Sequence, residues 1–226
     1  MPPEGALDRS RLANYYLHGD GIEIGALHRP LLVPEIAHVH YVDRMPVAEL
    51  RRQYAEHSHE LFVPVEVIDD GERLDKFSDG SQDFVIANHF LEHCQNPLLA
   101  LRSMLRVLRP GGVLYLAVPD KRFTFDVDRP VTTLEHLWRD YDNGPDTSRR
   151  QHFEEFTYFV QAFQGPGETE RQAQKLLDMD YSIHFHVWTQ FELMELLLSL
   201  RQRFGLTFNI ELMLKNGEEV IFILRA

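Results

Sequence analysis

An alternation of short apolar runs and helical stretches over residues 21–118 constrains the fold of this chain more than any other feature. Five runs predict strands at 21–25, 39–43, 63–68, 83–87 and 113–118. Helices are expected at 8–18, with Leu12, Tyr15 and Tyr16 on the apolar side, at 46–57, and at 96–108, where Arg109–Gly112 ends the helix. Strands joined by crossover segments pair in parallel, so the pattern predicts an α/β, doubly wound sheet.

The C-terminal part predicts one more helix and two more strands. The helix covers 189–203, with Phe191, Met194, Leu197 and Leu198 on its apolar side. Strands at 206–214 and 220–224 should form an antiparallel hairpin, because the Asn-Gly pair between them favours a tight turn. The expected fold is therefore a seven-stranded, mostly parallel sheet within one domain, 1–226, in which the aromatic-rich residues 120–185 form a helical lid insertion.

Composition excludes several classes of function. The net charge of −12 argues against non-specific nucleic-acid binding, which needs clustered Lys and Arg. A single cysteine, Cys94, rules out an intramolecular disulfide and a Cys-based zinc site. No apolar run reaches the roughly 20 residues of a membrane span, and residues 1–4 do not begin a secretory signal. We expect a cytoplasmic protein without nucleic-acid or membrane partners; the sequence leaves its oligomeric state open.

Two residues at strand ends predict a nucleoside site. Gly25 follows the first strand, where the absence of a Cβ lets the backbone approach a ligand. Asp43 ends the second strand and can accept both hydroxyls of a ribose. Their separation is close to the roughly 20 residues of a nucleoside-binding βαβ unit. Open parallel sheets bind ligands at the carboxyl ends of their strands, so both residues should face one site.

With these features in order, the chain resembles the class I S-adenosylmethionine-dependent methyltransferases, in the small-molecule branch similar to the methyltransferase type 11 family. The resemblance rests on Glu23–Gly25, Asp43, the acidic segment 68–72, the stretch 79–93 with its Leu-Glu-His turn, and the Arg-Val-Leu-Arg-Pro-Gly-Gly run at 106–112. It implies a Rossmann-like methyltransferase fold and S-adenosyl-L-methionine as cofactor. The cofactor-binding residues expected on this basis are Glu23, Gly25, Ala26, Leu27, Arg29, Asp43, Arg44, Asp69, Asp70, Gly71, Asn88 and His89.

The loop after the first strand departs from the family pattern of alternating glycines. Leu27 and Arg29 stand at the second and third glycine positions, and Pro30 and Pro34 should brace the loop. Arg29 either faces the cofactor carboxylate or is a solvated loop residue. Two alternatives therefore stay open: a catalytically inactive S-adenosylmethionine-binding partner, and a nicotinamide-dependent oxidoreductase, although the latter would favour an intact Gly-x-Gly-x-x-Gly loop.

Methyl transfer requires in-line positioning and, for a hydroxyl or amine acceptor, a base. Histidine suits that role because its pKa lies near neutral pH. The ending Pro119–Arg122 resembles methyltransferases of bacterial surface-polysaccharide systems, which implies a small-molecule acceptor with a sugar hydroxyl. The candidate catalytic residues are His93, Asp120, His152, His184 and His186.

The pair His184 and His186 raises the question of a metal. In an extended segment both imidazoles would point the same way, and Asp120 or Asp126 could complete a divalent site. Two histidines with one unlocated carboxylate are a thin ligand set, so the sequence assigns no metal site. Substrate contact and structural packing remain the other interpretations of this pair.

Overall fold

A seven-stranded sheet in the order β3-β2-β1-β4-β5-β7-β6 forms the centre of the computed structural model, which describes residues 7–57 and 59–226. The expectation for residues 1–4 lies outside the described residues. The first five strands pair in parallel, whereas β7 is antiparallel to β5 and to β6, which confirms the predicted fold. The strands are β1 (Gly19–Ile24), β2 (Ala37–Asp43), β3 (Val67–Ile68), β4 (Gln82–Asn88), β5 (Leu108–Pro119), β6 (Asn209–Asn216) and β7 (Glu219–Arg225).

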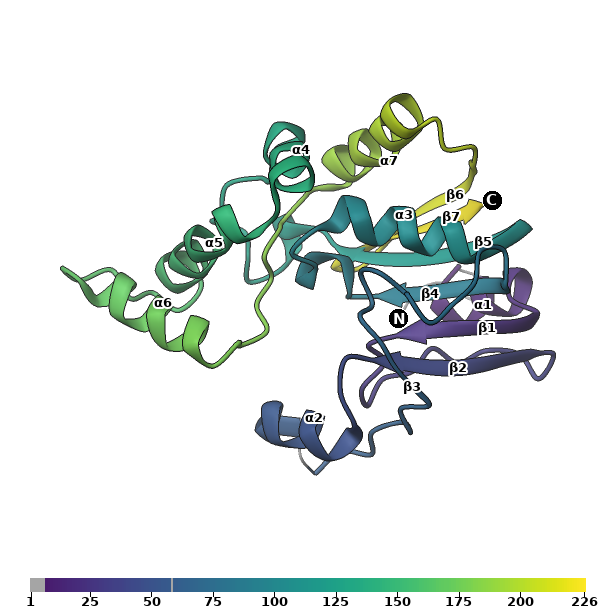
Figure 1. The fold of residues 1–226 in the computed structure, drawn as a ribbon, viewed down its shortest axis with the longest axis horizontal. Coiled ribbons are helices and arrows are strands. Elements are labelled where there is room, and N and C mark those ends of the chain that lie inside the picture. The colour runs from purple at the N-terminus through teal and green to yellow at the C-terminus, as the bar shows by residue number, and fades with distance from the viewer. Residues whose placement is uncertain (1–6, 58) are drawn as a thin grey trace.

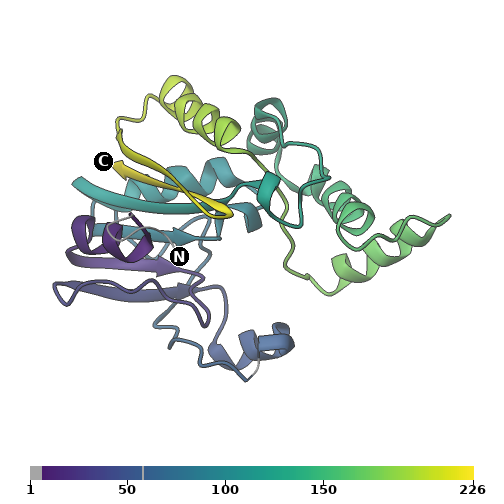
Figure 2. The same ribbon diagram turned by 180° about the vertical axis from the view of Figure 1, so that it is seen from behind.

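Helices cover both faces of the sheet. On one face α3 (Pro97–Val107) and α7 (Gln190–Phe204) pack over a large apolar core, and on the other α1 (Arg9–Tyr16) covers a smaller one (Figures 1 and 2). The remaining α-helices are α2 (Val47–Gln53), α4 (Leu134–Asn143), α5 (Asp146–Phe159) and α6 (Glu168–Asp178). Short 3-10 turns are η1 (Ala55–His57), η2 (Leu91–His93) and η3 (Lys121–Phe123). None of the helices in the described ranges is long and apolar enough to cross a membrane.

The two long helices on the core begin at side-chain caps. Asn96 accepts a hydrogen bond from the Leu99 amide at 3.0 Å, with Pro97 in the first turn, and Thr189 forms a capping box with Glu192 at the start of α7. α7 ends where Gly205 adopts a φ of 65°. These local signals explain why the predicted helices are found close to their expected bounds.

Several sequence expectations about faces and bounds are wrong in detail. α7 buries Leu193, Leu196, Leu197 and Leu200, whereas Phe191 and Leu198 are 62% and 45% exposed. α1 buries Leu12 and Ala13, and Tyr15 is 80% exposed. Apolar residues are frequent on more than one side of both helices, so packing partners rather than periodicity select the buried side.

Three bounds also differ. The third strand is only two residues long, and the helix expected at 46–57 divides into α2 and η1. Residues 109–112 begin β5 instead of capping α3, which ends at Val107; Gly111 has a φ of 83° within the strand. The ladder pairs of β5 are Leu108 with Gln82 and then Val113 onward, whereas Gly111 and Gly112 hydrogen-bond to Ala226 just past β7.

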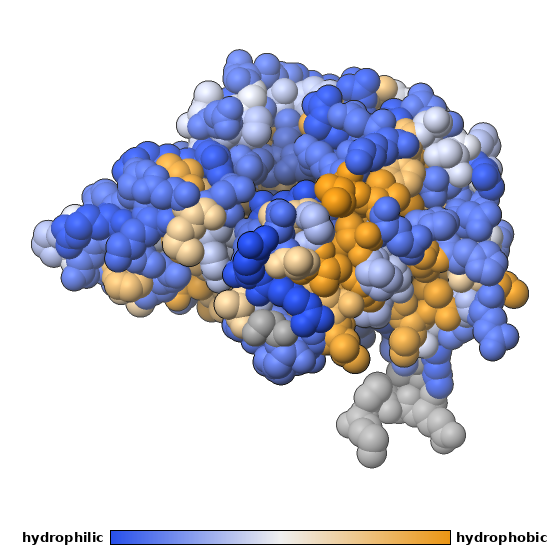
Figure 3. All heavy atoms as spheres, turned by 60° about the horizontal axis from the view of Figure 1, so that its bottom comes forward, coloured by the Kyte–Doolittle hydropathy of each residue, from blue (hydrophilic) through white to orange (hydrophobic). Residues whose placement is uncertain are grey.

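Residues 134–178 form a helical arm of α4, α5 and α6. The arm lies beyond the carboxyl ends of β1 and β4 (Figure 1). Within it α5 and α6 share a core of their own, which continues into the segment after α6, whereas Leu137 of α4 belongs to the main core. The surface of the arm is largely hydrophilic, whereas an apolar band crosses the body of the molecule beside it (Figure 3). The residues of the core that α5 and α6 share are Phe153, Phe156, Ala173, Leu176, Ile183 and Phe185.

Candidate functional site

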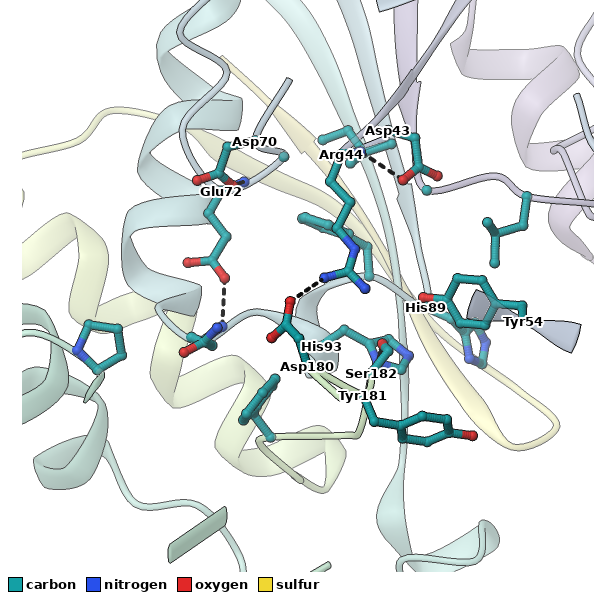
Figure 4. Close-up of a pocket in the computed structure, with 18 residues that line it drawn as sticks. Asp43, Arg44, Tyr54, Asp70, Glu72, His89, His93, Asp180, Tyr181 and Ser182 are labelled. Carbon is teal, nitrogen blue, oxygen red and sulfur yellow. Dashed lines mark hydrogen bonds and ion pairs between the residues drawn. The ribbon is translucent and has the colours of Figure 1, made fainter. Parts of the chain in front are cut away.

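A cavity of about 580 Å³ opens at the carboxyl ends of β1, β2 and β4, between these strand ends and the segment after α6 (Figure 4). It lies where the strand order reverses between β1 and β4, the usual ligand position of an open α/β sheet. Its volume suits a small molecule or nucleoside. The residues that line it are Ile24, Gly25, Leu27, Asp43, Arg44, Tyr54, Asp70, Gly71, Glu72, His89, Phe90, His93, Gln95, Pro145, Asp180, Tyr181, Ser182 and Phe185.

Asp43 and Gly25 form the part of this cavity next to β1 and β2. Gly25 has a φ of 66° and donates its amide to the Val42 carbonyl, which keeps the two strand ends together. Asp43 Oδ1 accepts the Arg44 amide at 2.7 Å. Burial raises the pKa of Asp43 to about 6, against the lowering effect of the Arg44 amide and guanidinium. A carboxylate at this position can accept ribose hydroxyls, so the strand end suits the nucleoside of the implied cofactor.

The acidic turn after β3 is held by its own hydrogen bonds. Asp69 accepts the amides of Asp70 and Lys76, while Asp70 accepts the amide of Glu72 at 2.9 Å. A Cβ on Gly71 would lie 2.6 Å from Phe90 Cζ, so only glycine fits there without a shift. Asp70 and Gly71 line the cavity, whereas Asp69 does not.

Glu72, in the same turn, fixes the far wall of the cavity. Its carboxylate accepts the amides of Gln95 at 2.6 Å and Asn96 at 2.9 Å, which join the turn to the start of α3 (Figure 4). Burial raises the pKa of Glu72 to about 7, although the two amides oppose the change. Both Glu72 and Gln95 line the cavity, and neither was among the site residues expected from the sequence.

His89 follows β4 and is held by a charged network. It has a φ of 50°, which is rare for a residue with a side chain, and its Nε2 lies 2.8 Å from Glu219 Oε2. Burial lowers the pKa of His89, but the hydrogen bond to Glu219 and the charge of Glu92 outweigh burial and raise it. Burial also opposes ionisation of Glu219, yet hydrogen bonds from Arg9, His89 and Asn216 lower its pKa to about 2.

His93, on η2, lines the cavity beside the segment after α6. Its Nδ1 lies 2.9 Å from the Ile183 carbonyl and 3.1 Å from Ser182 Oγ. A carbonyl can only accept, so Nδ1 carries the proton and Nε2 keeps a lone pair. Burial lowers the pKa of His93 to about 3, so the imidazole is neutral at physiological pH. Behind it, His184 Nδ1 donates to Asp126 Oδ2 at 2.6 Å, with the two imidazole rings 4.8 Å apart.

The structure brings eight of the expected site residues to one cavity and leaves the others outside its lining. Glu23 is buried, and its carboxylate accepts the Leu31 amide at 3.0 and 3.1 Å. Asp120 is fully buried and accepts hydrogen bonds from Arg122 and the Gln190 amide. The eight lining residues are Gly25, Leu27, Asp43, Arg44, Asp70, Gly71, His89 and His93; the others are Glu23, Ala26, Arg29, Asp69, Asn88, Asp120, His152, His184 and His186.

The imidazoles of His184 and His186 contact different groups, so the expectation that both would point to one site is wrong. His184 pairs with Asp126 and lies beside His93, whereas His186 lies among His136 and His152. Asp120 joins neither group, because Arg122 and the start of α7 occupy its carboxylate. Residues 181–187 form no regular strand, so alternation of side chains did not apply.

The segment after α6 supplies residues that sequence reasoning missed. Asp180, Tyr181 and Ser182 line the cavity, and Arg44 Nη1 donates to Asp180 Oδ2 at 3.2 Å. No motif marks this segment, because only the fold brings it to the strand ends. The acidic run at 68–72 could have indicated that Glu72 lines the cavity. No pattern in the sequence indicates this for Tyr54 or Pro145.

Known proteins are similar to the part of this chain that runs from β1 into β5. The family described as "Methyltransferase domain" matches residues 19–116. A human protein described as "Thiol S-methyltransferase TMT1B" is 38% identical over 90 residues, which is 40% of this chain and 34% of that protein. The chain therefore matches only about a third of the length of this curated relative.

Solved structures resemble the whole chain in fold. A putative Zn-dependent alcohol dehydrogenase from Rhodobacter sphaeroides gives a TM-score of 0.57 at 14% identity, over 94% of this chain and 86% of that one. An S-adenosylmethionine-dependent methyltransferase from Methanosarcina mazei gives 0.49 at 17% identity, over 97% and 98%. At 14% identity the first likeness bears on the fold alone, the doubly wound α/β architecture described above.

Proposed function

We propose a methyl-transfer reaction for this chain on one premise: residues 19–116 belong to the class I S-adenosylmethionine-dependent methyltransferases. The observation that carries the proposal is the position of Asp43 and Gly25 at adjacent strand ends, facing a cavity large enough for a nucleoside and a second small molecule. The family implies S-adenosyl-L-methionine as cofactor, which supplies an electrophilic methyl group on sulfur when bound.

In this proposal the cofactor half of the cavity is formed by the first three strand ends. Asp43 accepts the ribose hydroxyls, and Asp70 with Gly71 faces the nucleobase. Leu27 and Ile24 add apolar contact. His89, in a left-handed conformation after β4, lies between this half and the acceptor half.

The acceptor half lies beneath the helical arm. We assign residues 120–185 as a lid within a single domain, because Pro145, Asp180 and Phe185 reach the cavity from the arm and its connection to α7. A lid excludes water and holds the acceptor in line with the methyl group. Positioning of this kind contributes on the order of 7–11 kcal/mol.

His93 is the proposed group that orients the acceptor. Its proton faces the Ile183 carbonyl, so Nε2 can accept a hydrogen bond from an acceptor hydroxyl. Its pKa of about 3 makes His93 a weak base, so we assign it the role of positioning the acceptor rather than removing its proton. His184 stands behind it with its tautomer held by Asp126, as in other base–carboxylate pairs.

We propose a small neutral hydroxyl compound, such as a saccharide, as the acceptor. The lining holds four carboxyl groups, from Asp43, Asp70, Glu72 and Asp180, and the Arg44 guanidinium that pairs with Asp180; this excess of acidic groups disfavours an anionic acceptor. Tyr181, Ser182 and Gln95 add hydrogen-bonding groups suited to hydroxyls. The name of the human relative makes a thiol the second candidate acceptor.

The test measures formation of S-adenosylhomocysteine by the full chain with panels of saccharides, thiols and carboxylic acids. We expect turnover with hydroxyl compounds, lowered by about 10²-fold in His93→Ala because the reacting oxygen loses the group that orients it. His40→Gln, at an exposed pair with Glu66, is the matched control. Turnover with thiols alone would replace the hydroxyl proposal, and full activity of His93→Ala would exclude its assigned role.

A further inference from the structure

Four side chains of types that can bind a metal meet where the helical arm contacts the segment before α7, outside the lining of the cavity. His136 and Asp140 lie one turn apart on α4, His152 is on α5, and His186 precedes α7. One ligand atom from each lies within 4.8 Å of all the others. None of the four belongs to the site proposed for the cofactor and acceptor.

The spacing of these atoms fits a metal ion better than a set of hydrogen bonds. His136 Nε2 lies 3.0 Å from His152 Nε2 and 3.0 Å from Asp140 Oδ2, and His152 Nε2 lies 4.0 Å from the same oxygen. Zinc–ligand bonds of about 2.0–2.2 Å in a tetrahedron put neighbouring ligand atoms about 3.3 Å apart. A single proton on His136 Nε2 cannot serve both neighbours at once.

Burial supplies a second, independent observation. His186 is 0% exposed and Asp140 1% exposed, yet His186 Nδ1 and Asp140 Oδ1 have no hydrogen-bond partner. Buried polar atoms without partners are rare and costly. A bound cation would supply the missing partner of His186 Nδ1, with Asp140 Oδ2, the oxygen that faces His136 and His152, as its carboxylate ligand.

The protonation states also suit a metal. Burial lowers the pKa of His152 to about 3 and holds that of His186 well below its usual value, so both imidazoles are neutral. Neutral imidazole is the ligand form, since the metal takes the nitrogen lone pair. Arg139 Nη2 now lies 2.7 Å from His136 Nδ1, and this half-exposed side chain can turn to solvent when that nitrogen carries a proton.

Neighbouring groups hold Asp140 and His186 in place. Ser148 Oγ donates to Asp140 Oδ2 at 2.5 Å, and His186 Nε2 lies 3.4 Å from the Gln95 carbonyl. The His186 ring also stacks on Trp188 at 5.7 Å between ring centres. Such outer contacts orient metal ligands and fix their tautomers.

We propose that His136, Asp140, His152 and His186 bind one Zn²⁺ ion in a closed structural site. Three imidazole nitrogens and one carboxylate oxygen form a ligand set typical of zinc, and four protein ligands leave no open position for substrate. The ion joins α4 and α5 to the segment that enters α7. Gln95 and Phe185 lie between this site and the cavity, so the ion fixes one wall of the acceptor half.

The test measures zinc in the full chain after removal of metal with a chelator, dialysis and titration with Zn²⁺ alone. We expect one tightly bound Zn²⁺ per chain by elemental analysis and a higher melting temperature with zinc than without. Co²⁺ in its place should give the intense visible absorption of a tetrahedral site. Binding of Mg²⁺ in preference to Zn²⁺, or no stoichiometric zinc, would overturn the proposal.

Variants locate the ion. His186→Gln and Asp140→Asn keep side-chain volume, and each should lower zinc affinity by at least 10-fold. Changing a residue that only supports a metal ligand already costs about 10–100-fold in affinity, so losing a ligand itself should cost no less. His184→Gln is the matched control, two residues away in the separate Glu92–His93–His184 group. Loss of zinc in His184→Gln, with retention in soluble, folded His186→Gln, would assign the ion to that other group and overturn this one.

Discussion

Arg44 Nη1 donates a hydrogen bond to Asp180 Oδ2 at 3.2 Å, and both residues line the cavity (Figure 4). Arg44 follows β2 on the sheet side, and Asp180 follows α6 on the arm side. Asp180 also pairs with Arg149 of α5. The contact therefore joins the segment after α6, and through Arg149 the arm, to the strand ends beside the cavity.

Breaking this contact should change ligand binding more than stability. Both side chains are partly exposed, 39% and 64%, so Arg44→Ala and Asp180→Ala should each alter the free energy of unfolding by no more than about 1 kcal/mol. Arg44→Ala should raise the KM for the acceptor about 2–5-fold, and Asp180→Ala at least as much because it also loses the pair with Arg149. The double variant should resemble Asp180→Ala, in which Arg44 has already lost its partner. If the increases in KM of the two single variants multiplied in the double variant, the contact would not have this role. Arg73→Ala, which breaks the exposed pair of Arg73 with Asp75, is the control and should leave the KM unchanged.

Cofactor affinity should fall in acid because of Asp43. With a pKa of about 6, its carboxylate is nearly fully ionised at pH 8 but only about one-tenth ionised at pH 5, so the affinity for S-adenosylhomocysteine should drop about tenfold. Arg44 is the charged neighbour that opposes this protonation. Calorimetry across this range should give a smaller pH dependence in Asp43→Asn; an equal slope in both proteins would assign the titration elsewhere.

Glu219 should stabilise the fold above its unfolded pKa. Its folded pKa of about 2 lies below the usual 4.5, so its contribution is present above about pH 4.5 and is lost as the pH falls towards 2. Replacing it in Glu219→Gln removes the partner of Arg9 and His89 and should cost about 1–3 kcal/mol at pH 7. Acid unfolding curves should then be flatter than in wild type, whereas Glu49→Gln, at an exposed pair, should leave them unchanged.

Gly71→Ala tests the close approach of the acidic turn to Phe90. The added methyl would lie 2.6 Å from Phe90 Cζ and 2.7 Å from Ile24 Cγ2, and overpacking of this kind costs about 1–3 kcal/mol. Both neighbours line the cavity, so weaker S-adenosylhomocysteine binding should accompany the loss of stability. Gly80→Ala, with only the Leu108 carbonyl at 4.0 Å, should leave binding intact despite backbone strain.

The sequence predicted the sheet and its order of elements well. Apolar runs, the capped helices and the Asn216-Gly217 turn are local signals, and the fold follows them. The side of α7 that is buried could not be read in the same way, since Phe191 and Leu193 are both apolar and only packing distinguishes them.

The site was predicted unevenly for a similar reason. Asp43 and Gly25 occupy strand ends, whose position in space follows from the topology. Asp180 and Glu72 reach the cavity through contacts between distant segments, which no spacing in the sequence reveals. The group around His186 likewise brings together residues up to 50 positions apart on three segments.

Binding of S-adenosylhomocysteine to wild type and to Asp43→Asn, measured by calorimetry at pH 8, tests the central claim most directly. We predict one site per chain and an affinity loss of about 10–100-fold in the variant, the worth of hydrogen bonds to a charged group. Asp75→Asn, at an exposed carboxylate, should bind like wild type. Absence of binding to folded wild type, unchanged affinity in Asp43→Asn, or binding of NAD⁺ instead would contradict the account.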